Sequence, residues 1–341
     1  MIFTIPDETL THMQTQSSLR ITFISTFSAP FIEDDLETLK RYYRTEVQIG
    51  SGIFHIFKIA LSCLRSDIAF CWFASTYTSV AVALMRLLGR RSVLVIGGVD
   101  VAKDEKLKYG IWLVPWKALL VRYAIRHATK IMAVDKSLAE KACHLVRYDG
   151  KNIEIVPTGY DIDFWKISEA NKTISVLTVA IVNDELRFRV KGIDMLFEVA
   201  RSLPHISFTM IGLTKEIIKL FNPPSNIELF PPMDRKLLLP YYQRAKVYCQ
   251  PSRQEGMSNV LCEAMLCGCI PVATDVGATK SVLGEIGICV PPNVDALTLA
   301  LTQALQLSER ICPAAREQII SRFDKGTREK KLTQIVKLLL Q

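Results

Sequence analysis

The sequence has 341 residues, a length typical of two domains of ordinary size. Hydrophobic residues make up 49% of it and charged residues 22%, which is a globular composition and excludes a largely disordered chain. The net charge of +8 is compatible with nucleic acid, an anionic membrane surface or a phosphorylated ligand, so the positions of the charges have to decide between these partners.

The first residues of the sequence and its longest apolar runs indicate where in the cell the protein is expected. Residues 1–20 have neither a basic start nor an apolar core, so we expect no signal peptide. The runs at 53–64 and 111–120 are shorter than the roughly 20 residues of a spanning helix. We therefore predict a cytoplasmic protein, at most peripheral on the inner face of the membrane. Its nine cysteines are then expected to be reduced, with Cys262, Cys267 and Cys269 as core thiols rather than a zinc site.

Strand-like runs alternate with helical patterns through the first half of the chain. They lie at 19–25, 46–49, 67–73, 92–96, 130–134 and 153–156. This alternation predicts a parallel sheet covered by helices on both faces. Gly98 and Asp100, directly after the fourth run, would lie at the end of a strand, although a tight turn explains the glycine equally well.

The segment 109–127 combines two Trp and two Tyr residues with basic and aliphatic ones. A helix from Pro115 would place Arg122 and Arg126 on one stripe, with Lys117 near its start. Such a helix could lie on an anionic bilayer surface. An interior helix with a basic edge is the other interpretation.

The pattern restarts in the second half. Strand-like runs lie at 174–181, 207–211, 227–229, 247–250, 270–273 and 288–290. Helical patterns lie at 194–202, 236–245, 259–267 and 294–306, and an amphipathic pattern covers 328–340. The sequence thus predicts two successive α/β domains, with a linker at 157–172. In such sheets ligands bind at the carboxyl ends of the strands.

Two glutamates eight residues apart carry the strongest functional signal. Glu255 stands on a loop and Glu263 inside a helix, and the small or polar residues between them would leave backbone amides free at the helix start. Such a helix end binds anions. Glu263, about one turn on, could accept hydrogen bonds from a ribose diol, and Glu255 could face a sugar beyond the phosphate. A structural pair, one capping acid and one solvated acid, is the alternative.

This arrangement resembles the E-x7-E motif of retaining glycosyltransferases of family 4, which have the GT-B fold. Three further motifs recur in order: the basic segment 187–192, the P-x-G-x-D turn at 157–161, and the G-x-P-V-x-A-T run with its later glycine at 268–277. The likeness covers roughly residues 150–325, and the N-terminal half only in outline.

The resemblance implies a fold and a set of site residues. The fold would be two Rossmann-like, doubly wound parallel-sheet domains facing across a cleft. Residues 1–160 would form the acceptor side, 161–325 the nucleotide-sugar domain, and 326–341 a helix crossing back to the first domain. Catalysis would involve Glu255, Lys191 and Arg187. Donor binding would involve Arg189, Gly192, Gly256, Met257, Ser258, Asn259 and Glu263. Gly98 and Asp100 are candidates for contact with the acceptor or the donor sugar. Which of the two arginines contacts the diphosphate stays open, as does whether Asn259 caps its helix.

The implied reaction is transfer of a sugar from a nucleotide-sugar donor to a lipid-linked, polysaccharide or other hydroxyl acceptor, with retention of configuration. No metal or other cofactor is expected, and the Asp161-x-Asp163 pair is interpreted as turn chemistry. A GT-B-shaped epimerase or hydrolase of sugar nucleotides is one alternative. A non-catalytic basic protein that binds nucleic acid or membrane is another, but no nucleic-acid-binding motif occurs, so we expect no nucleic acid partner.

Overall fold

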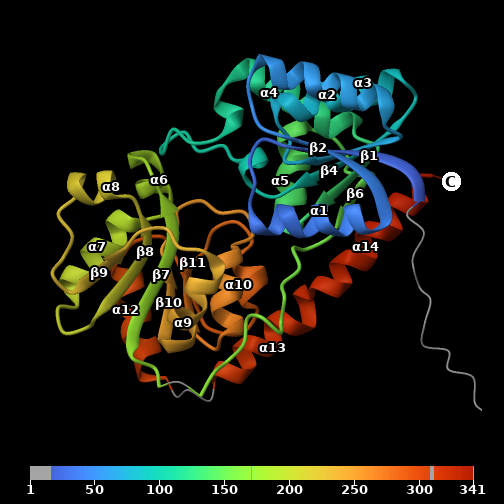
Figure 1. The fold of residues 1–341 in the computed structure, drawn as a ribbon. Coiled ribbons are helices and arrows are strands. Elements are labelled where there is room, and N and C mark those ends of the chain that lie inside the picture. The colour runs from blue at the N-terminus through green and yellow to red at the C-terminus, as the bar shows by residue number, and fades with distance from the viewer. Residues whose placement is uncertain (1–16, 170, 308–310, 341) are drawn as a thin grey trace, which may run out of the picture.

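Two α/β domains make up the protein, of which a computed structural model describes residues 17–169, 171–307 and 311–340 (Figure 1). Most of the segment on which the expectation about a signal peptide depends, residues 1–16, lies outside the described residues. Each domain contains one six-stranded, wholly parallel sheet.

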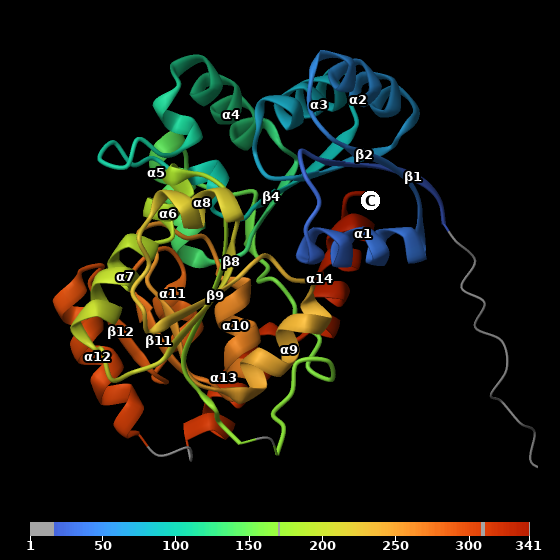
Figure 2. The same ribbon diagram turned by 60° about the vertical axis from the view of Figure 1, so that its left-hand side comes forward.

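The first sheet has the strand order β2-β1-β3-β4-β5-β6. Its strands are β1 (Ser17–Ser25), β2 (Tyr43–Ile49), β3 (Ile68–Trp72), β4 (Arg91–Ile96), β5 (Lys130–Ala133) and β6 (Ile153–Ile155). Its helices are α1 (Pro30–Tyr42), α2 (Ile53–Arg65), α3 (Thr76–Leu87), α4 (Pro115–His127) and α5 (Lys136–Val146), with short 3-10 turns at Val99–Val101 and Ile111–Leu113. Helices α2, α3 and α4 lie next to one another on one side of the sheet (Figures 1 and 2).

The second sheet has the order β12-β11-β10-β7-β8-β9. Its strands are β7 (Ile174–Val182), β8 (Phe208–Leu213), β9 (Ile227–Phe230), β10 (Ala245–Gln250), β11 (Ile270–Thr274) and β12 (Ile288–Val290). Its helices are α6 (Glu185–Val190), α7 (Ile193–Ser202), α8 (Lys215–Leu220), α9 (Arg235–Arg244), α10 (Asn259–Leu266), α11 (Thr279–Leu283), α12 (Val294–Gln306) and α13 (Ile311–Phe323).

The central strands are apolar because helices cover both faces of each sheet. Every residue of β3 and of β11 is buried, as continuous hydrophobic runs predict for parallel strands. The predicted α/β class with two parallel sheets is therefore confirmed. The basic segment 187–192 lies largely within a short helix, which Asp184 caps by accepting a hydrogen bond from the Arg187 amide at 2.6 Å.

The last helix, α14 (Lys325–Leu338), leaves the second domain and runs alongside α1 of the first (Figures 1 and 2). Leu332, Ile335 and Val336 are buried on it. Arg328 is also buried and forms a 2.6 Å ion pair with Asp35 of α1. The predicted domain limits at residues 160 and 325 stay a prediction.

Candidate functional site

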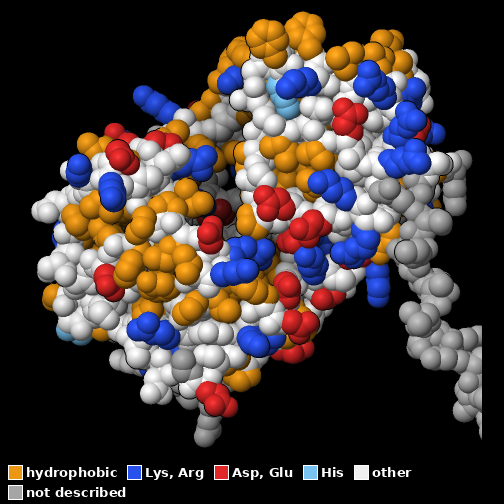
Figure 3. All heavy atoms as spheres, in the orientation of Figure 1, with side chains coloured by type: hydrophobic (Ala, Val, Ile, Leu, Met, Phe, Trp, Pro, Cys, Tyr) orange, Lys and Arg blue, Asp and Glu red, His pale blue; other side chains and the backbone are white. Residues whose placement is uncertain are grey.

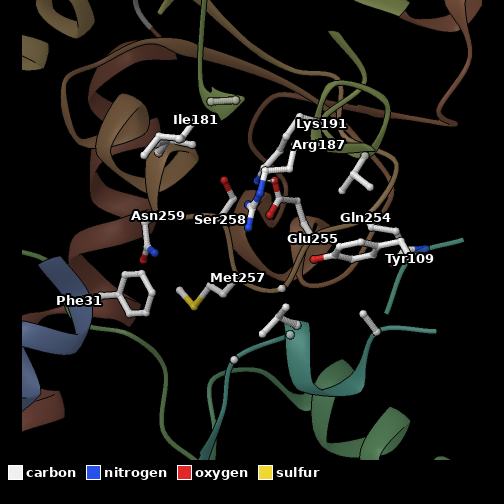
Figure 4. A pocket seen from close by; sticks show the side chains of 18 of the residues that line it. Phe31, Tyr109, Ile181, Arg187, Lys191, Gln254, Glu255, Met257, Ser258 and Asn259 are labelled. Atoms are coloured by element: carbon white, nitrogen blue, oxygen red, sulfur yellow. Dashed lines mark hydrogen bonds and ion pairs between the residues drawn. The ribbon is translucent and has the colours of Figure 1, made fainter. Parts of the chain in front are cut away.

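A cleft of about 370 Å³ lies between the two domains, at the carboxyl ends of both sheets. The second domain contributes the loop before α10 and the end of α6, and the first domain contributes Phe31, the Gly97–Gly98 turn and Tyr109 (Figure 4). A second cavity of about 250 Å³ adjoins it and shares residues of β7 and α10 with it. Together they form one extended site with a polar end and a more enclosed apolar end.

The start of α10 lies at the polar end. Ser258 is the N-cap and accepts a hydrogen bond from the Leu261 amide at 3.4 Å, so the cap is Ser258 and not Asn259. The side chain of Asn259 instead accepts a hydrogen bond from the Tyr160 hydroxyl at 2.8 Å. Among the described residues, the backbone amides from Gly256 to Val260 have no acceptor, which leaves them available to an anion in the cleft.

Lys191 and Glu255 meet beside this helix start. The Lys191 Nζ lies 2.5 Å from Glu255 Oε1, and the same oxygen accepts a hydrogen bond from Ser252 Oγ at 2.9 Å. The lysine and glutamate side chains are 24% and 12% exposed, so the pair is partly screened from water yet open to the cleft. Figure 4 shows both side chains, with Arg187, converging on the same space.

Hydrogen bonds of Arg253 and a close backbone approach at Gly192 hold together the two loops that carry Lys191 and Glu255. The amide of Arg253 donates to the Val190 carbonyl at 2.8 Å, and its guanidinium donates to the Arg189 carbonyl and to Asp194. Gly192 has a left-handed backbone, and a Cβ there would lie 1.8 Å from the Pro251 carbonyl oxygen. This glycine therefore lets the loop after Lys191 approach the loop before Glu255.

Glu263 lies in the second cavity, one turn further along α10. Burial raises the pKa of its carboxyl to about 7, although Arg235 at 3.5 Å and the Tyr242 hydroxyl at 3.3 Å favour the charged form. Arg235 also approaches Asp34 of the first domain at 3.9 Å and stacks over the Trp165 ring. The Arg235 Nε is buried without a hydrogen-bond partner, so it could donate a hydrogen bond to an acceptor atom of a ligand.

The two domains touch through glycines on opposite sides of the cleft. A Cβ on Gly98 would lie 2.4 Å from Gly256 Cα, and one on Gly256 would lie 1.9 Å from the Gly97 carbonyl oxygen. Gln254 and Asp104 bridge the same junction with a 2.8 Å hydrogen bond. The absence of side chains at these glycines is what allows the cleft to be this narrow.

The predicted site residues do not all face the cleft. Besides those above, Arg187, Met257, Ser258 and Gly98 line it. The Arg189 side chain is 60% exposed and pairs with Glu185 at 2.5 Å on the outer side of α6. Asp100 is buried behind the Gly97–Gly98 turn, where it accepts hydrogen bonds from the amides of Gly98 and Ala74, and burial raises its pKa to about 6. It shapes the turn rather than the cleft surface.

Several residues near the site were not predicted from the sequence. Ser252 directly precedes the acidic motif, and this proximity could have identified it. Arg235, Arg253 and Tyr109 carry no comparable signal, because their contacts are with residues distant in the sequence. The two aspartates of the 157–172 linker do form a turn, with Asp161 accepting hydrogen bonds from the amides of Asp163 and Phe164.

Among residues 17–169, 171–307 and 311–340, no helix is both long and apolar enough to cross a bilayer. These residues also contain no cluster of three or more His, Cys, Asp or Glu side chains suited to a metal ion.

All nine cysteines are free thiols, and burial raises the pKa of Cys262 and of Cys269 to about 12.

Comparison with known proteins connects this geometry to a family. Residues 176–307 match the family model of the glycosyl transferases group 1. A 70-residue stretch is 39% identical to the O-antigen chain mannosyltransferase B of Escherichia coli, and this match spans 20% of the chain and 18% of that protein.

Two solved structures share the fold across 94% of this chain. Anabaena HepE in complex with UDP-glucose superposes with a TM-score of 0.75 and 14% identity over 100% of its chain. The sucrose-phosphate synthase of Thermosynechococcus elongatus superposes with a TM-score of 0.74 and 15% identity over 99% of its chain. The chain thus has the GT-B fold, and its second domain is similar over residues 176–307 to the glycosyl transferases group 1 family.

Proposed function

We propose that the protein transfers a sugar from a nucleotide-sugar donor to an acceptor hydroxyl, with retention of configuration at the anomeric carbon. The observation that carries this proposal is the convergence of Lys191, Arg187 and the free amides of α10 around Glu255, in a cleft that continues to Glu263. The spacing suits a diphosphate at the helix start, a ribose toward Glu263 and a sugar toward the first domain.

The basic groups would neutralise the leaving diphosphate. The bond between the anomeric carbon and the β-phosphate oxygen breaks, and negative charge grows on that phosphate as it departs. Lys191, Arg187 and the amides at the start of α10 would receive this charge, which would lower the barrier. These groups suffice in the proposal without a metal ion, so we expect a chelator to leave turnover unchanged.

The acceptor would attack on the same face of the sugar. Its oxygen forms the new bond to the anomeric carbon, and its proton passes to the departing diphosphate. Glu255, held by Lys191 and Ser252, would orient the hydroxyls of the transferred sugar. When the diphosphate binds, it competes with Glu255 for Lys191, so one carboxylate–lysine pair is exchanged for a phosphate–lysine pair.

Relatives suggest which donors and acceptors to test first. HepE is described in complex with UDP-glucose, and the E. coli relative is described as an O-antigen chain mannosyltransferase. We propose UDP- and GDP-linked hexoses as first donors, and polysaccharide or lipid-linked glycans as first acceptors. We propose a cytoplasmic location for this reaction.

A thermal-shift panel of UDP-, GDP-, ADP- and TDP-sugars tests donor binding. A true donor at a hundredfold excess over its Kd should stabilise the protein by about 2.7 kcal/mol. Nuclear magnetic resonance of the product then tests retention. Release of free sugar or of an isomerised nucleotide sugar, unaffected by any acceptor, would support an epimerase or hydrolase instead, and no stabilisation by any donor would contradict the proposal.

The two arginines of α6 provide a matched pair of variants. Arg187→Ala should raise the KM for the donor or lower kcat about 10-fold or more, because it removes a cation from the phosphate end. Arg189→Ala should leave both constants nearly unchanged, since that side chain pairs with Glu185 outside the cleft. Steady-state kinetics at varied donor concentration distinguishes them. Equal effects of the two substitutions would contradict the assignment of Arg187.

A further inference from the structure

Helix α2 exposes an apolar stripe that no part of the described chain covers. Ile53, Phe54, Phe57, Leu61 and Leu64 are each more than half exposed, and Phe54 reaches 79%. From Phe54 onward they follow a spacing of three, four and three residues, which places them along one face of the helix. The opposite face, with Ile59 and Cys63, packs on the sheet.

The two neighbouring helices extend this apolar surface. Leu87 at the end of α3 is 83% exposed, and Trp116 and Leu119 of α4 are 59% and 67% exposed. Figure 3 shows apolar side chains gathered along the edge of the molecule that α2, α3 and α4 form in Figure 1. We call the outer surface of α2, α3 and α4 the three-helix face.

The three-helix face is also strongly basic. Its helices contain no Asp or Glu, although the chain has 34 such residues and α1 of the same domain carries four. They contain six lysines and arginines: Lys58, Arg65, Arg86, Lys117, Arg122 and Arg126. Apolar and cationic side chains therefore share one face without acidic neighbours on their own helices.

We propose that the three-helix face docks on the surface of an anionic lipid bilayer. Phenylalanine, leucine and tryptophan side chains would enter the boundary between head groups and acyl chains, while the cations contact anionic head groups. The contact would be interfacial, since none of the three helices is long enough to span a bilayer.

Two other occupants fit the face less well. A second copy of the chain in a two-fold dimer would bring the same six cations against themselves, with no acidic side chain on these helices to pair with them. A nucleic acid would pair with the cations but would leave the large aliphatic side chains without an apolar partner.

The sequence-based expectation placed the membrane contact on residues 109–127 alone. The structure corrects this in two ways. Tyr109 lines the cleft, and the buried Trp112 donates a hydrogen bond to the Asp100 carbonyl, so the start of the segment is internal. The cations Arg122 and Arg126 donate to carbonyls of residues 145 and 147, so part of the basic stripe is tied to the protein. Helix α2, not α4, supplies most of the exposed apolar side chains.

The docking proposal does not depend on the transfer reaction. If the reaction holds, however, the face would give a lipid-linked acceptor a short route to the cleft, because only six residues separate Tyr109 in the cleft from Trp116 on the face. Donor binding and vesicle binding are measured separately, so either proposal can fail alone.

Vesicle co-sedimentation of the full chain tests the face. We expect at least about tenfold stronger binding to phosphatidylcholine vesicles with roughly a third phosphatidylglycerol than to pure phosphatidylcholine, weakened by about 0.5 M salt. Phe54→Ser with Phe57→Ser should reduce this binding at least about tenfold, as should Lys58→Glu with Arg65→Glu. The matched controls are Leu220→Ser with Leu299→Ser, both more than 60% exposed on the second domain, and Lys219→Glu with Lys236→Glu.

Trp116 offers a second readout that does not require a destabilising substitution. It is the one exposed tryptophan of four, since Trp72, Trp112 and Trp165 are buried. Its emission should shift to shorter wavelength on anionic vesicles and be quenched by lipids brominated on the acyl chain. The Trp116→Phe variant should lose this signal while still sedimenting with vesicles.

The outcomes of these experiments distinguish a lipid bilayer from other partners of the three-helix face. Stronger binding to anionic vesicles that falls in both face variants and persists in both controls supports the proposal, provided that thermal unfolding shows the variants folded. It is overturned if the wild-type chain ignores anionic vesicles, or if face and control variants bind alike. It is also overturned if the chain is a dimer by light scattering that Phe54→Ser with Phe57→Ser dissociates.

Discussion

At the scale of single residues, the contact between Lys191 and Glu255 gives the site its two opposed charges. The proposed diphosphate must displace the carboxylate from the lysine, so Glu255 acts against binding of the free nucleotide while serving the transferred sugar. The two roles of this residue can therefore be separated by measuring affinity and turnover independently.

Glu255→Gln keeps the shape of the side chain and removes its charge. We expect kcat to fall about 100-fold or more, while the affinity for the free nucleoside diphosphate rises a few-fold, because Lys191 loses its competing anion. Calorimetry and steady-state kinetics provide the two measurements. Glu185→Gln, on the exposed side of α6, is the control, and unchanged turnover in Glu255→Gln would show that the chemistry lies elsewhere.

Glu263 predicts a dependence of stability on pH. Its carboxyl has a pKa of about 7 in the folded protein against 4.5 for the ordinary group. Between these values the folded state holds more protons than the unfolded state, so stability falls as the pH rises from 4.5 to 7. Relative to wild type, Glu263→Gln should gain on the order of 3 kcal/mol over this range.

Urea unfolding at pH 5 and pH 7.5 measures this gain. The relevant quantity is the change in the free energy of unfolding between the two pH values and not its absolute value. The loss of the ion pair with Arg235 shifts the free energy of unfolding of the variant equally at both pH values. Glu140→Gln, an exposed acid on α5, should show no such gain. Parallel pH profiles for wild type and Glu263→Gln would refute the prediction.

The sequence could predict the acids and the lysine but not the groups that surround them. Glu255, Glu263 and Ser258 lie within nine residues, so their relation follows from one loop and one helix. Arg235 reaches Glu263 from a position 28 residues earlier, and Arg253, on the loop before α10, pairs with Asp194 at the start of α7. Such contacts depend on tertiary packing, which no local pattern encodes.

At the scale of elements, hydrophobic periodicity predicted an apolar run within each of the twelve strands named above, because each buried strand is such a run between turns. In the second half it gave ranges for α7, α9, α10, α12 and α14, but none for α8, α11 and α13. The expected helix at 294–306 has those bounds in the structure, and strand ends shifted only by a few residues. Helix α6 was missed because it is only six residues long, half of them charged, and its formation depends on the Asp184 cap.

The loop before α10 depends on a glycine at 256. A methyl group there would meet the Gly97 carbonyl oxygen of the other domain at 1.9 Å, so Gly256→Ala should hold the domains apart. We expect kcat/KM to fall about 100-fold, since small misplacements across a cleft are costly. Small-angle scattering should show a larger radius of gyration than in wild type.

Gly326→Ala is the control for this substitution, because its Cβ would meet only a flexible carboxylate oxygen at 3.1 Å. It should leave both the kinetics and the scattering curve unchanged. Normal catalysis by Gly256→Ala would show that the close approach of the two domains is not required for turnover.

At the scale of the whole molecule, α14 ties the domains together through a buried ion pair. Arg328 donates to both oxygens of Asp35 and to the carbonyls of Val156 and Pro157, and Trp72 also donates to Asp35. Arg328→Ala leaves a buried carboxylate unpaired, so we expect a loss of about 3–5 kcal/mol.

The exposed pair Arg41–Glu329 between the same two helices is the control for Arg328→Ala. Arg41→Ala should cost at most about 1 kcal/mol, because solvent screens that pair. Urea or thermal unfolding measures both variants. If Arg328→Ala proves no more destabilising than Arg41→Ala, the buried pair is not the anchor.

The placement of α14 also has a consequence for biosynthesis. Residues 17–156 leave the ribosome first, but their Asp35 finds its guanidinium only when residue 328 has been translated. Until then the Asp35 carboxyl has to stay in contact with water or be protonated, and the apolar surface that Leu332 and Val336 will cover stays open to water. The first domain is thus completed only after α14 has been made.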